Sequence, residues 1–376
     1  MRERLFAFDV PCFSTIRSWI LRVGHYALTR PLDRETPWVW LIDHTMQIGT
    51  VKMFAILGCP LNRVPFGERA LQLSDLQLVA LVPMEKSNAA LVDAELVKAV
   101  DRVGQPHTIV SDQGTDLVGG IARFQNFYMR THFVPDAAHY GANVLKNAWK
   151  KLPRWNEFVK KLQETSAKVR QTPSAYLLAP KSRTDARFMN VDRPLRFANR
   201  VLTHLDGTAP QAKAVEYYGW LKDFRADLVI WHREHGLVQT MIARLRIHGL
   251  HRGSLAEIDA EWGEIGTCPS TVRIAARLRT YVRTYRPKEA GVRLVTSTEI
   301  LESSFGKLKR IEGEQSQSSM TGLVLAMGAI VGEGTKEDKK EALDATPQKN
   351  VDQWVKNVLG HSMQWFRRQF FAQPKA

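Results

Sequence analysis

The sequence predicts a mixed α/β fold in which helices flank a five-stranded sheet and a long all-helical stretch interrupts the chain. Three observations lead to this prediction. Five runs of apolar and β-branched residues lie between residues 38 and 136, and the later runs alternate with helical patterns. From residue 141 to about residue 290, helical patterns continue without a persuasive strand.

The five predicted strands are short and are bounded by turn residues. The first two form a hairpin around a tight turn that contains glycine. The strands cover residues 38–48, 50–58, 76–84, 107–112 and 131–136. Between them, Ser87 is the expected N-cap of a helix over 87–104, Gly104 ends that helix, and a second helix covers 118–130.

The rest of the chain is predicted to consist of helices and loops. Pro153 breaks the helical pattern of residues 142–170. The charged stretch 333–350 is expected to be a mobile linker. Further helices are expected over residues 13–28, 214–249, 270–285, 297–311 (with Ser297 or Thr298 at its cap) and 351–371, the last of them amphipathic.

The composition of the 376-residue chain fits a water-soluble globular protein, since 44% of its residues are hydrophobic and 24% are charged. The longest apolar run begins at Met320 and is shorter than the roughly 20 residues that cross a bilayer, so no membrane segment is expected. Cys12, Cys59 and Cys268 lack the spacing of metal ligands. The cysteines therefore predict a reducing, cytoplasmic location without disulfides or a zinc site.

The positive charge of the chain is concentrated in its middle. The whole chain has a formal net charge of +15 at pH 7, and residues 141–290 contain 27 basic and 14 acidic side chains. An excess of this size is typical of a surface that binds a polyanion, most often nucleic acid, because neutralised phosphates release their condensed counterions. A basic surface that is merely solvated is the alternative.

Asp43 and Asp112 stand out among the acidic residues of the predicted sheet. Asp43 lies within an apolar run, where an unpaired ionised carboxylate is costly, so it is expected to be paired, neutral or metal-bound. Asp112 ends the fourth strand, and Gly114 lets the chain turn away at once. Two carboxylates at neighbouring strand ends, with a third from a later helix, form an oxygen-only site suited to Mg²⁺ or Mn²⁺. Alternatives are a turn-capping role for Asp43, an Asx turn at Asp112, and Asp116 as the ligand in place of Asp112.

The order of these elements resembles that of the DDE transposases, and of bacterial insertion-sequence transposases in particular. Asp43 lies in "LIDHT", Asp112 in "IVSDQGTDL" and Glu302 in "ILESSFGKLKR", and the resemblance covers about residues 35–330. It implies a ribonuclease-H-like mixed five-stranded sheet with flanking helices, interrupted by an all-α insertion. It also implies that Asp43, Asp112 and Glu302 are catalytic and hold two Mg²⁺ or Mn²⁺ ions. Glu299, one turn before Glu302, is the alternative third ligand.

A long insertion and a second local pattern connect the chain to the hAT group of these enzymes. The carboxylates of Asp112 and Glu302 are 190 positions apart in the sequence, which implies an insertion before the last catalytic helix, and this insertion carries the excess positive charge. The stretch "PDAAHYGANVLKN" is similar to a hAT pattern and offers Asp136 and His139 as active-site support. A histidine that bonds a backbone carbonyl in the core is an equally good interpretation of His139, and Asp136 is similarly open.

The last predicted helix carries further features of the resemblance. Phe305 and Lys309 share one helix face with Glu302, and Lys309 resembles a lysine that some insertion-sequence transposases use on DNA phosphate. The tyrosine and arginine that accompany that lysine are absent, because Val295 and Thr298 occupy the equivalent positions. The chain therefore departs from that particular subgroup.

Several basic and aromatic residues are candidates for contact with DNA. Related enzymes that form DNA hairpins stack a flipped base on an aromatic residue of the insertion, and Trp231 is the candidate here, with Trp220 second. The alternative is that Trp231 packs between the insertion helices. The other predicted DNA-binding residues are Arg233 beside Trp231, Arg183 and Arg187 in the basic stretch 181–200, and Lys307, Lys309 and Arg310 on the last catalytic helix.

Together these features predict a metal-dependent enzyme that cleaves DNA strands at transposon ends and transfers them to target DNA. The expected partner is double-stranded DNA, bound by a homodimer or a higher assembly, in a cytoplasmic, nucleoid-associated location without membrane contact. A catalytically silent DNA-binding descendant and a structure-specific nuclease of the same fold are the alternatives. The predicted organisation is the end of a DNA-binding segment (1–35), the first part of the core (36–140), the basic helical insertion (141–290), the final core helices (291–332), and a linker with a C-terminal helix (333–376).

Overall fold

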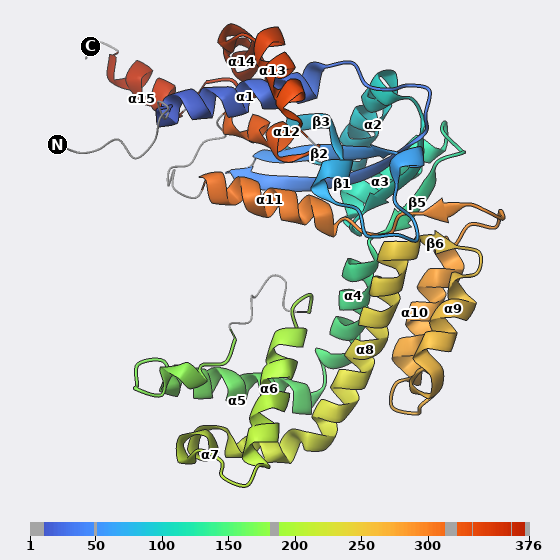
Figure 1. Cartoon of the computed structure of the whole chain (residues 1–376), viewed down its shortest axis with the longest axis vertical. Helices are drawn as coiled ribbons and strands as arrows, with labels where there is room; N and C mark the ends of the chain where they lie inside the picture. The colour runs from blue at the N-terminus through green and yellow to red at the C-terminus, as the bar shows by residue number, and fades with distance from the viewer. Residues whose placement is uncertain are drawn as a thin grey trace. The chain divides into compact units, whose positions relative to one another are not determined.

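The chain divides into two compact units, one of which contains the sheet (Figure 1). The first unit comprises Met1–Val134 together with Ser297–Ala376, and the second comprises Pro135–Thr296. The computed structural model describes residues 11–48, 51–180, 188–312, 322–332, 334–361 and 363–372. The predicted insertion, residues 141–290, lies within the second unit. In these described ranges, no helix combines the length and the apolar character needed to cross a membrane.

Five strands form the sheet of the first unit, in the order β3-β2-β1-β4-β5. β2 is antiparallel to both β1 and β3, whereas β4 is parallel to β1. The sheet is therefore mixed, as predicted, and its order is compatible with a ribonuclease-H-like fold. The strands are β1 (Trp38–Ile48), β2 (Val51–Pro60), β3 (Gln77–Met84), β4 (Pro106–Ser111) and β5 (His132–Pro135).

Both faces of the central strands are apolar, because each face is covered by helices. Trp38, Trp40 and Ile42 of β1 form one hydrophobic core with α2 (Ala89–Val103) and α3 (Thr115–Gln125). Val39 and Leu41, which alternate with them, are equally buried and point to the other face. There α11 (Glu299–Glu312) contacts β1, and α1 (Phe13–Thr29) and α12 (Ala326–Ile330) contact β3.

The helix α1 packs within the first unit, and its predicted origin as the end of a DNA-binding segment stays a prediction. It packs on α12 and on α13 (Lys336–Ala345). The crossing with α12 is so close that a Cβ atom added to Gly24 would lie 1.8 Å from the Leu325 carbonyl oxygen. Gly328 approaches α1 in the same way, since its Cβ would lie 2.7 Å from the Gly24 oxygen. Only glycine at these positions allows the two backbones to meet.

The predicted linker 333–350 is largely helical. Thr335 and Asp338 form a capping box at the start of α13, in which Thr335 Oγ1 accepts from the Asp338 N–H and Asp338 Oδ2 accepts from the Thr335 N–H. Ala342 is buried and anchors this charged helix, so the capping box and one apolar contact outweigh the charged composition that suggested a linker. α14 (Gln348–Trp354), a π-helical turn over Val355–Leu359, and α15 (Met363–Ala372) follow in place of one continuous terminal helix.

The second unit is predominantly helical, with one two-stranded ribbon that was not predicted, β6 (Leu250–His251) paired with β7 (Arg293–Leu294). Pro153 begins α5, as the predicted break requires. Aromatic side chains from α4, α5 and α8 form much of its core, because large rings fill the space between crossing helices. Its helices are α4 (Ala137–Trp149), α5 (Pro153–Val169), α6 (Asp192–Leu205), α7 (Ala212–Tyr218), α8 (Arg225–His248), α9 (Ser254–Trp262) and α10 (Val272–Tyr285).

Candidate active site

Asp43 and Asp112 come from the two parallel strands at the centre of the sheet. The pairing of β1 with β4 places Leu41 opposite Val110. Continued by two residues, this register places Asp43 opposite Asp112, on strands about 4.8 Å apart. Because side chains alternate along a strand, both carboxylates then belong to the face of Leu41 and Val110, opposite the face that α2 and α3 cover. Both residues are half-buried.

Local hydrogen bonds orient these two carboxylates. Asp43 Oδ1 accepts from the backbone N–H of His44 at 2.7 Å, and Asp112 Oδ1 accepts from the backbone N–H of Gly114 at 2.9 Å. The Asx turn considered for Asp112 is therefore present, and it leaves Oδ2 of Asp112 for another ligand. A Cβ atom at Gly114 would lie 3.0 Å from Asp112 Oδ1 and 3.1 Å from Asp116 Oδ1, so a glycine keeps this turn tight.

Glu302 lies on the exposed side of α11, in its first turn. Leu301, Phe305 and Leu308 form the buried side of this helix, which runs beside β1 (Figure 1). α11 contacts the strand that carries Asp43, on the face opposite α2 and α3. The alternative ligand, Glu299, is half-buried and its Oε2 accepts from the Ser297 hydroxyl at 3.3 Å.

The three carboxylates match the chemistry of a divalent-ion site but do not form a closed one in this conformation. Hard cations such as Mg²⁺ prefer carboxylate oxygens, and Asp43, Asp112 and Glu302 supply only oxygen. Over the part of the chain that the structure describes, no group of three His, Cys, Asp or Glu side chains is arranged to hold a metal ion. Asp43 lies on β1, Asp112 follows the neighbouring strand β4, and Glu302 lies on α11, which contacts β1, so the three carboxylates belong to adjacent elements of the first unit.

Lys307, Lys309 and Arg310 follow Glu302 on α11, and all three are exposed. Lys309 and Arg310 lie in the last turn, where positive charge favours the helix dipole. The helix therefore presents a carboxylate near its start and cations near its end. The predicted DNA contacts of the three cations stay predictions.

A hydrogen-bonded cluster that the sequence did not reveal lies beside Asp43. His44 Nε2 is 3.0 Å from Asp116 Oδ2 and 2.9 Å from Ser87 Oγ, and the Ser87 hydroxyl also donates to Asp116 Oδ2. The cluster connects the end of β1, the residues before α2 and the first turn of α3. Ser87 is not the N-cap of α2 as expected, because the neighbouring Asn88 takes that position and its side chain accepts from the Leu91 N–H.

The cluster differs from a catalytic Ser-His-Asp triad. In a triad the serine and the carboxylate bond opposite nitrogens of the imidazole. Here both contact Nε2 of His44, while its buried Nδ1 has no hydrogen-bond partner among the described residues. The arrangement fits a neutral ring with its hydrogen on Nε2. The cluster braces three elements behind the candidate site and does not activate Ser87.

Burial and neighbouring groups set the charges in this cluster. Burial lowers the pKa of His44 below its ordinary value, against the opposing effect of Asp116. Burial alone would raise the pKa of Asp116, but the hydrogen bond from Ser87 and the proximity of His44 outweigh it and lower the pKa. Asp116 is therefore an ionised acceptor for Ser87 and His44. These contacts favour a structural role for Asp116 over the metal-ligand alternative.

Asp136 and His139 lie in the second unit and take part in capping α4. Asp136 is the N-cap, fully buried, and its Oδ1 accepts from the backbone N–H of His139 at 2.7 Å. The Tyr281 hydroxyl donates to the neighbouring Pro135 carbonyl oxygen at 2.7 Å. This contact explains why Asp136 is buried at the start of α4. A supporting role of Asp136 or His139 in catalysis remains a prediction.

Trp231 is a core residue of the second unit and not an exposed stacking surface. Its side chain is 2% exposed and packs against Trp155 and Phe158, as the packing alternative expected. The second candidate, Trp220, is half-buried and its Nε1 donates to Thr165 Oγ1 at 3.1 Å. A heptad-like run of apolar residues on both sides of Trp231 was the sequence signal for burial.

The remaining predicted DNA contacts are basic residues of the second unit. Arg233 is exposed on α8, two residues after the buried Trp231. Arg183 and Arg187 lie outside the described residues. Only Arg233 among the three can therefore be placed on a surface.

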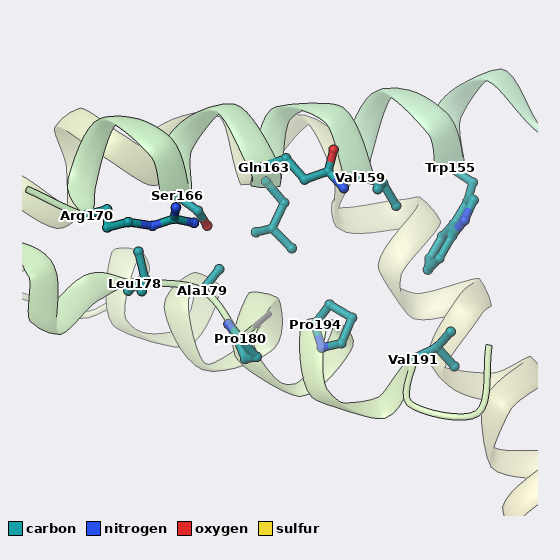
Figure 2. Close-up of a pocket in the computed structure, with 11 residues that line it drawn as sticks. Trp155, Val159, Gln163, Ser166, Arg170, Leu178, Ala179, Pro180, Val191 and Pro194 are labelled. Carbon is teal, nitrogen blue, oxygen red and sulfur yellow. The ribbon is translucent and has the colours of Figure 1, made fainter. Parts of the chain in front are cut away.

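The second unit also contains an apolar cavity that no sequence feature suggested (Figure 2). Its volume is about 240 Å³, and it lies between α5 and the segments around Ala179 and Pro194. Trp155 closes one end and Arg170 lies toward the other (Figure 2). The cavity is smaller than the roughly 300–1,000 Å³ of typical small-molecule sites, so we assign no ligand to it.

Comparisons with known proteins give a weak likeness. No family model matches the chain, and no curated protein matches it. Among solved structures, it is similar to the Drosophila P element transposase strand transfer complex, with 13% sequence identity and a TM-score of 0.39 over 88% of this chain and 87% of that chain. At this level of similarity, the activity has to be argued from the chain's own residues.

Proposed function

We propose that the chain is a DNA transposase of the DDE class with a ribonuclease-H-like core, which cleaves DNA strands at transposon ends and joins them to target DNA. The observation that carries the proposal is that Asp43 lies on β1 and Asp112 directly follows β4, the parallel neighbour of β1, while Glu302 lies on α11, the helix that contacts β1. The fold alone does not explain three carboxylates on adjacent elements, because like charges repel one another. Phosphodiester chemistry with divalent ions does need them.

In this proposal, Asp43, Asp112 and Glu302 hold two Mg²⁺ ions, which would lower the pKa of the attacking water and stabilise the leaving oxygen. The hydrogen bonds from the His44 and Gly114 backbones orient the two aspartates before any ion binds. The brace of His44, Ser87 and Asp116 supports the strand end beneath them. Lys309 contacts DNA phosphate. Cleavage frees a 3′-hydroxyl, which attacks target DNA at the same carboxylates, so no covalent protein intermediate is required.

The proposal implies double-stranded DNA as the partner. Two transposon ends have to be brought together before strand transfer, so we expect a homodimer or a higher assembly on DNA. The 28 basic and 15 acidic residues of the second unit provide the charge for this binding.

The test is Mg²⁺-dependent cleavage of DNA fragments that flank the coding region, compared between the wild type and D43N, D112N and E302Q. We expect product from the wild type only. Mn²⁺ binding, followed by electron paramagnetic resonance, gives a readout that does not depend on the DNA sequence, and each variant should weaken it. Equal products and equal Mn²⁺ binding for all four proteins would overturn the proposal. Products of strand transfer distinguish a transposase from a nuclease of the same fold.

A further inference from the structure

The helices α4 and α10 lie side by side in the second unit. The rings of Tyr140 and Tyr281 are 4.7 Å apart, and the Tyr140 hydroxyl donates to the Arg277 carbonyl oxygen at 3.2 Å. Tyr281, near the end of α10, also reaches the Pro135 carbonyl at the start of α4. The two helices are therefore antiparallel, and the residues that flank their contact form one continuous surface.

The exposed sides of the two helices meet at this contact. On α4, exposed residues recur every three or four positions along the side of the helix next to Tyr140. On α10, exposed residues recur with the same spacing along the side of the helix next to the buried Tyr281. The surface that they form, called here the α4–α10 face, consists of Asn143, Lys146, Asn147 and Lys150 of α4 and Arg273, Arg277, Thr280 and Thr284 of α10.

The α4–α10 face is basic because acidic residues are missing from both sequences. Residues 137–156 and 265–288 contain no Asp or Glu. The nearest acids are turned inward. Asp136 is buried at the start of α4, and Glu234 of α8 is buried where it accepts from Trp149 Nε1 at 2.6 Å. Burial raises the pKa of Glu234, against the opposing effects of the Trp149 hydrogen bond and Arg273.

Several other cations of the second unit are neutralised by ion pairs. Arg154 pairs with Asp227, Arg225 with Asp206 and Arg244 with Glu257. On α10 itself, Arg279 points to the other side of the helix and pairs with Asp259. By contrast, within the described ranges of the chain, no ion pair forms at Lys146, Lys150, Arg273 or Arg277. These four cations lie on two helices that contact each other.

We propose that the α4–α10 face binds the phosphate backbone of double-stranded DNA. This inference rests on the proposed function for the choice of duplex DNA as the polyanion. Four cations, two amides and two hydroxyls are the side chains that contact phosphate and sugar oxygens in protein–DNA complexes. Contacts of this kind position a duplex and carry no sequence information directly. It differs from the contacts predicted from sequence, none of which involves α4 or α10.

The experiment measures binding of a fluorescein-labelled, mixed-sequence 30-bp duplex by anisotropy, in EDTA and between 50 and 200 mM KCl. The variant K146Q/K150Q/R273Q/R277Q should bind at least about tenfold more weakly at 100 mM KCl. The slope of log K against log salt should fall by about 3 to 4, because each lost phosphate contact removes roughly 0.9. A matched variant, K160Q/K168Q/K213Q/K222Q, removes the same charge from exposed positions elsewhere in the unit and should keep most of the affinity and slope.

Three results would overturn the inference: an unchanged affinity of the α4–α10 variant, an equal loss in the matched variant, or preferential binding of duplex RNA or polyglutamate by the wild type. Circular dichroism checks that both variants are folded, and single substitutions R273Q and R277Q should each give a fraction of the full effect. Because EDTA removes divalent ions, the measurement is separate from catalysis. D112N should bind the duplex like the wild type. A failed binding experiment would therefore contradict the inference about the α4–α10 face, whereas a failed cleavage experiment would contradict the proposed function.

Discussion

The two units of the chain differ in how they use charge. The first unit has 25 basic and 23 acidic residues, nearly balanced, and its unusual feature is a set of carboxylates at one edge of a sheet. The second has 28 basic and 15 acidic residues, and its unusual feature is cations left without ion pairs on α4 and α10. Carboxylates gathered on a rigid sheet suit chemistry, whereas cations spread along helices suit binding of an extended polyanion. The comparison teaches that the two functions can be damaged separately.

The largest expected effect is the difference between substitutions of Asp112 and Asp116, which are four residues apart. D112N should reduce Mg²⁺-dependent DNA cleavage by more than about a hundredfold, because even outer-sphere partners of metal ligands cost about 10–100-fold. D116N should reduce it much less, because Asp116 bonds Ser87 and His44. Cleavage rates at saturating DNA measure both. If D116N were the more damaging substitution and also weakened Mn²⁺ binding more, Asp116 would be the metal ligand and Asp112 the structural residue.

The next effect concerns stability and tests whether α1 belongs to the first unit. G24A should lower the free energy of unfolding by about 3 kcal/mol, because the new methyl group meets the Leu325 carbonyl and overpacking of this kind costs about 1–3 kcal/mol or more. Hydrogen exchange measured by mass spectrometry should show faster exchange in α1 and α12 while α8 is unaffected.

A matched control lies in the second unit. Gly236 of α8 has no atom within 4 Å of an added Cβ, so G236A should stabilise its helix by up to about 1 kcal/mol through helix propensity alone. Destabilisation of both units by G24A, or of neither, would contradict the division of the chain into two separately packed units.

Much of the sheet could be predicted from the sequence, because its signals are local. The alternation of apolar residues along β1 and β2 and the end of α2 at Gly104 follow from short-range preferences, whereas the N-cap is Asn88 and not the predicted Ser87. The segment 333–350 was mispredicted because its charged composition outweighed a readable capping box, Thr335 and Asp338. The ribbon of β6 and β7 was missed because each strand has two residues, too short for any periodicity.

The candidate site was predictable only in part. Asp43 and Asp112 are visible as carboxylates at strand ends, and the parallel pairing of β1 with β4 is consistent with their expected adjacency. The brace could not be foreseen, since His44, Ser87 and Asp116 are far apart in the sequence and each has an ordinary local role. Trp231 shows that a tryptophan beside an arginine does not by itself identify a DNA-binding surface, because the apolar residues around it, spaced like a heptad, already indicated burial.

A smaller effect tests the brace itself. S87A removes the donor to Asp116 and should destabilise the first unit by about 1–2 kcal/mol, the cost of leaving a partly buried acceptor without its hydrogen bond. DNA cleavage should fall less than tenfold, because Asp43 and Asp112 keep their backbone hydrogen bonds. K86A, an exposed neighbour, should change the unfolding free energy by less than about 0.5 kcal/mol. An S87A protein as stable as K86A would show that the brace contributes nothing measurable.

The smallest expected effect concerns Glu234, which is buried in the second unit. Because burial raises the pKa of Glu234, its ionised form is disfavoured in the folded state, and this penalty is present at high pH and vanishes as pH falls below the unfolded-state pKa. E234Q should therefore raise the unfolding free energy by up to about 1 kcal/mol at pH 8, the scale of one net hydrogen bond, and by less at pH 5. Denaturant unfolding at the two pH values measures the difference, and a gain that is larger at pH 5 would contradict the sign.

The same substitution removes a carboxylate that attracts Arg273, so duplex DNA should bind E234Q at least as tightly as the wild type. A weaker complex would mean that Glu234 holds Arg273 in place for the phosphate, and that buried acids as well as exposed cations shape the DNA-binding surface.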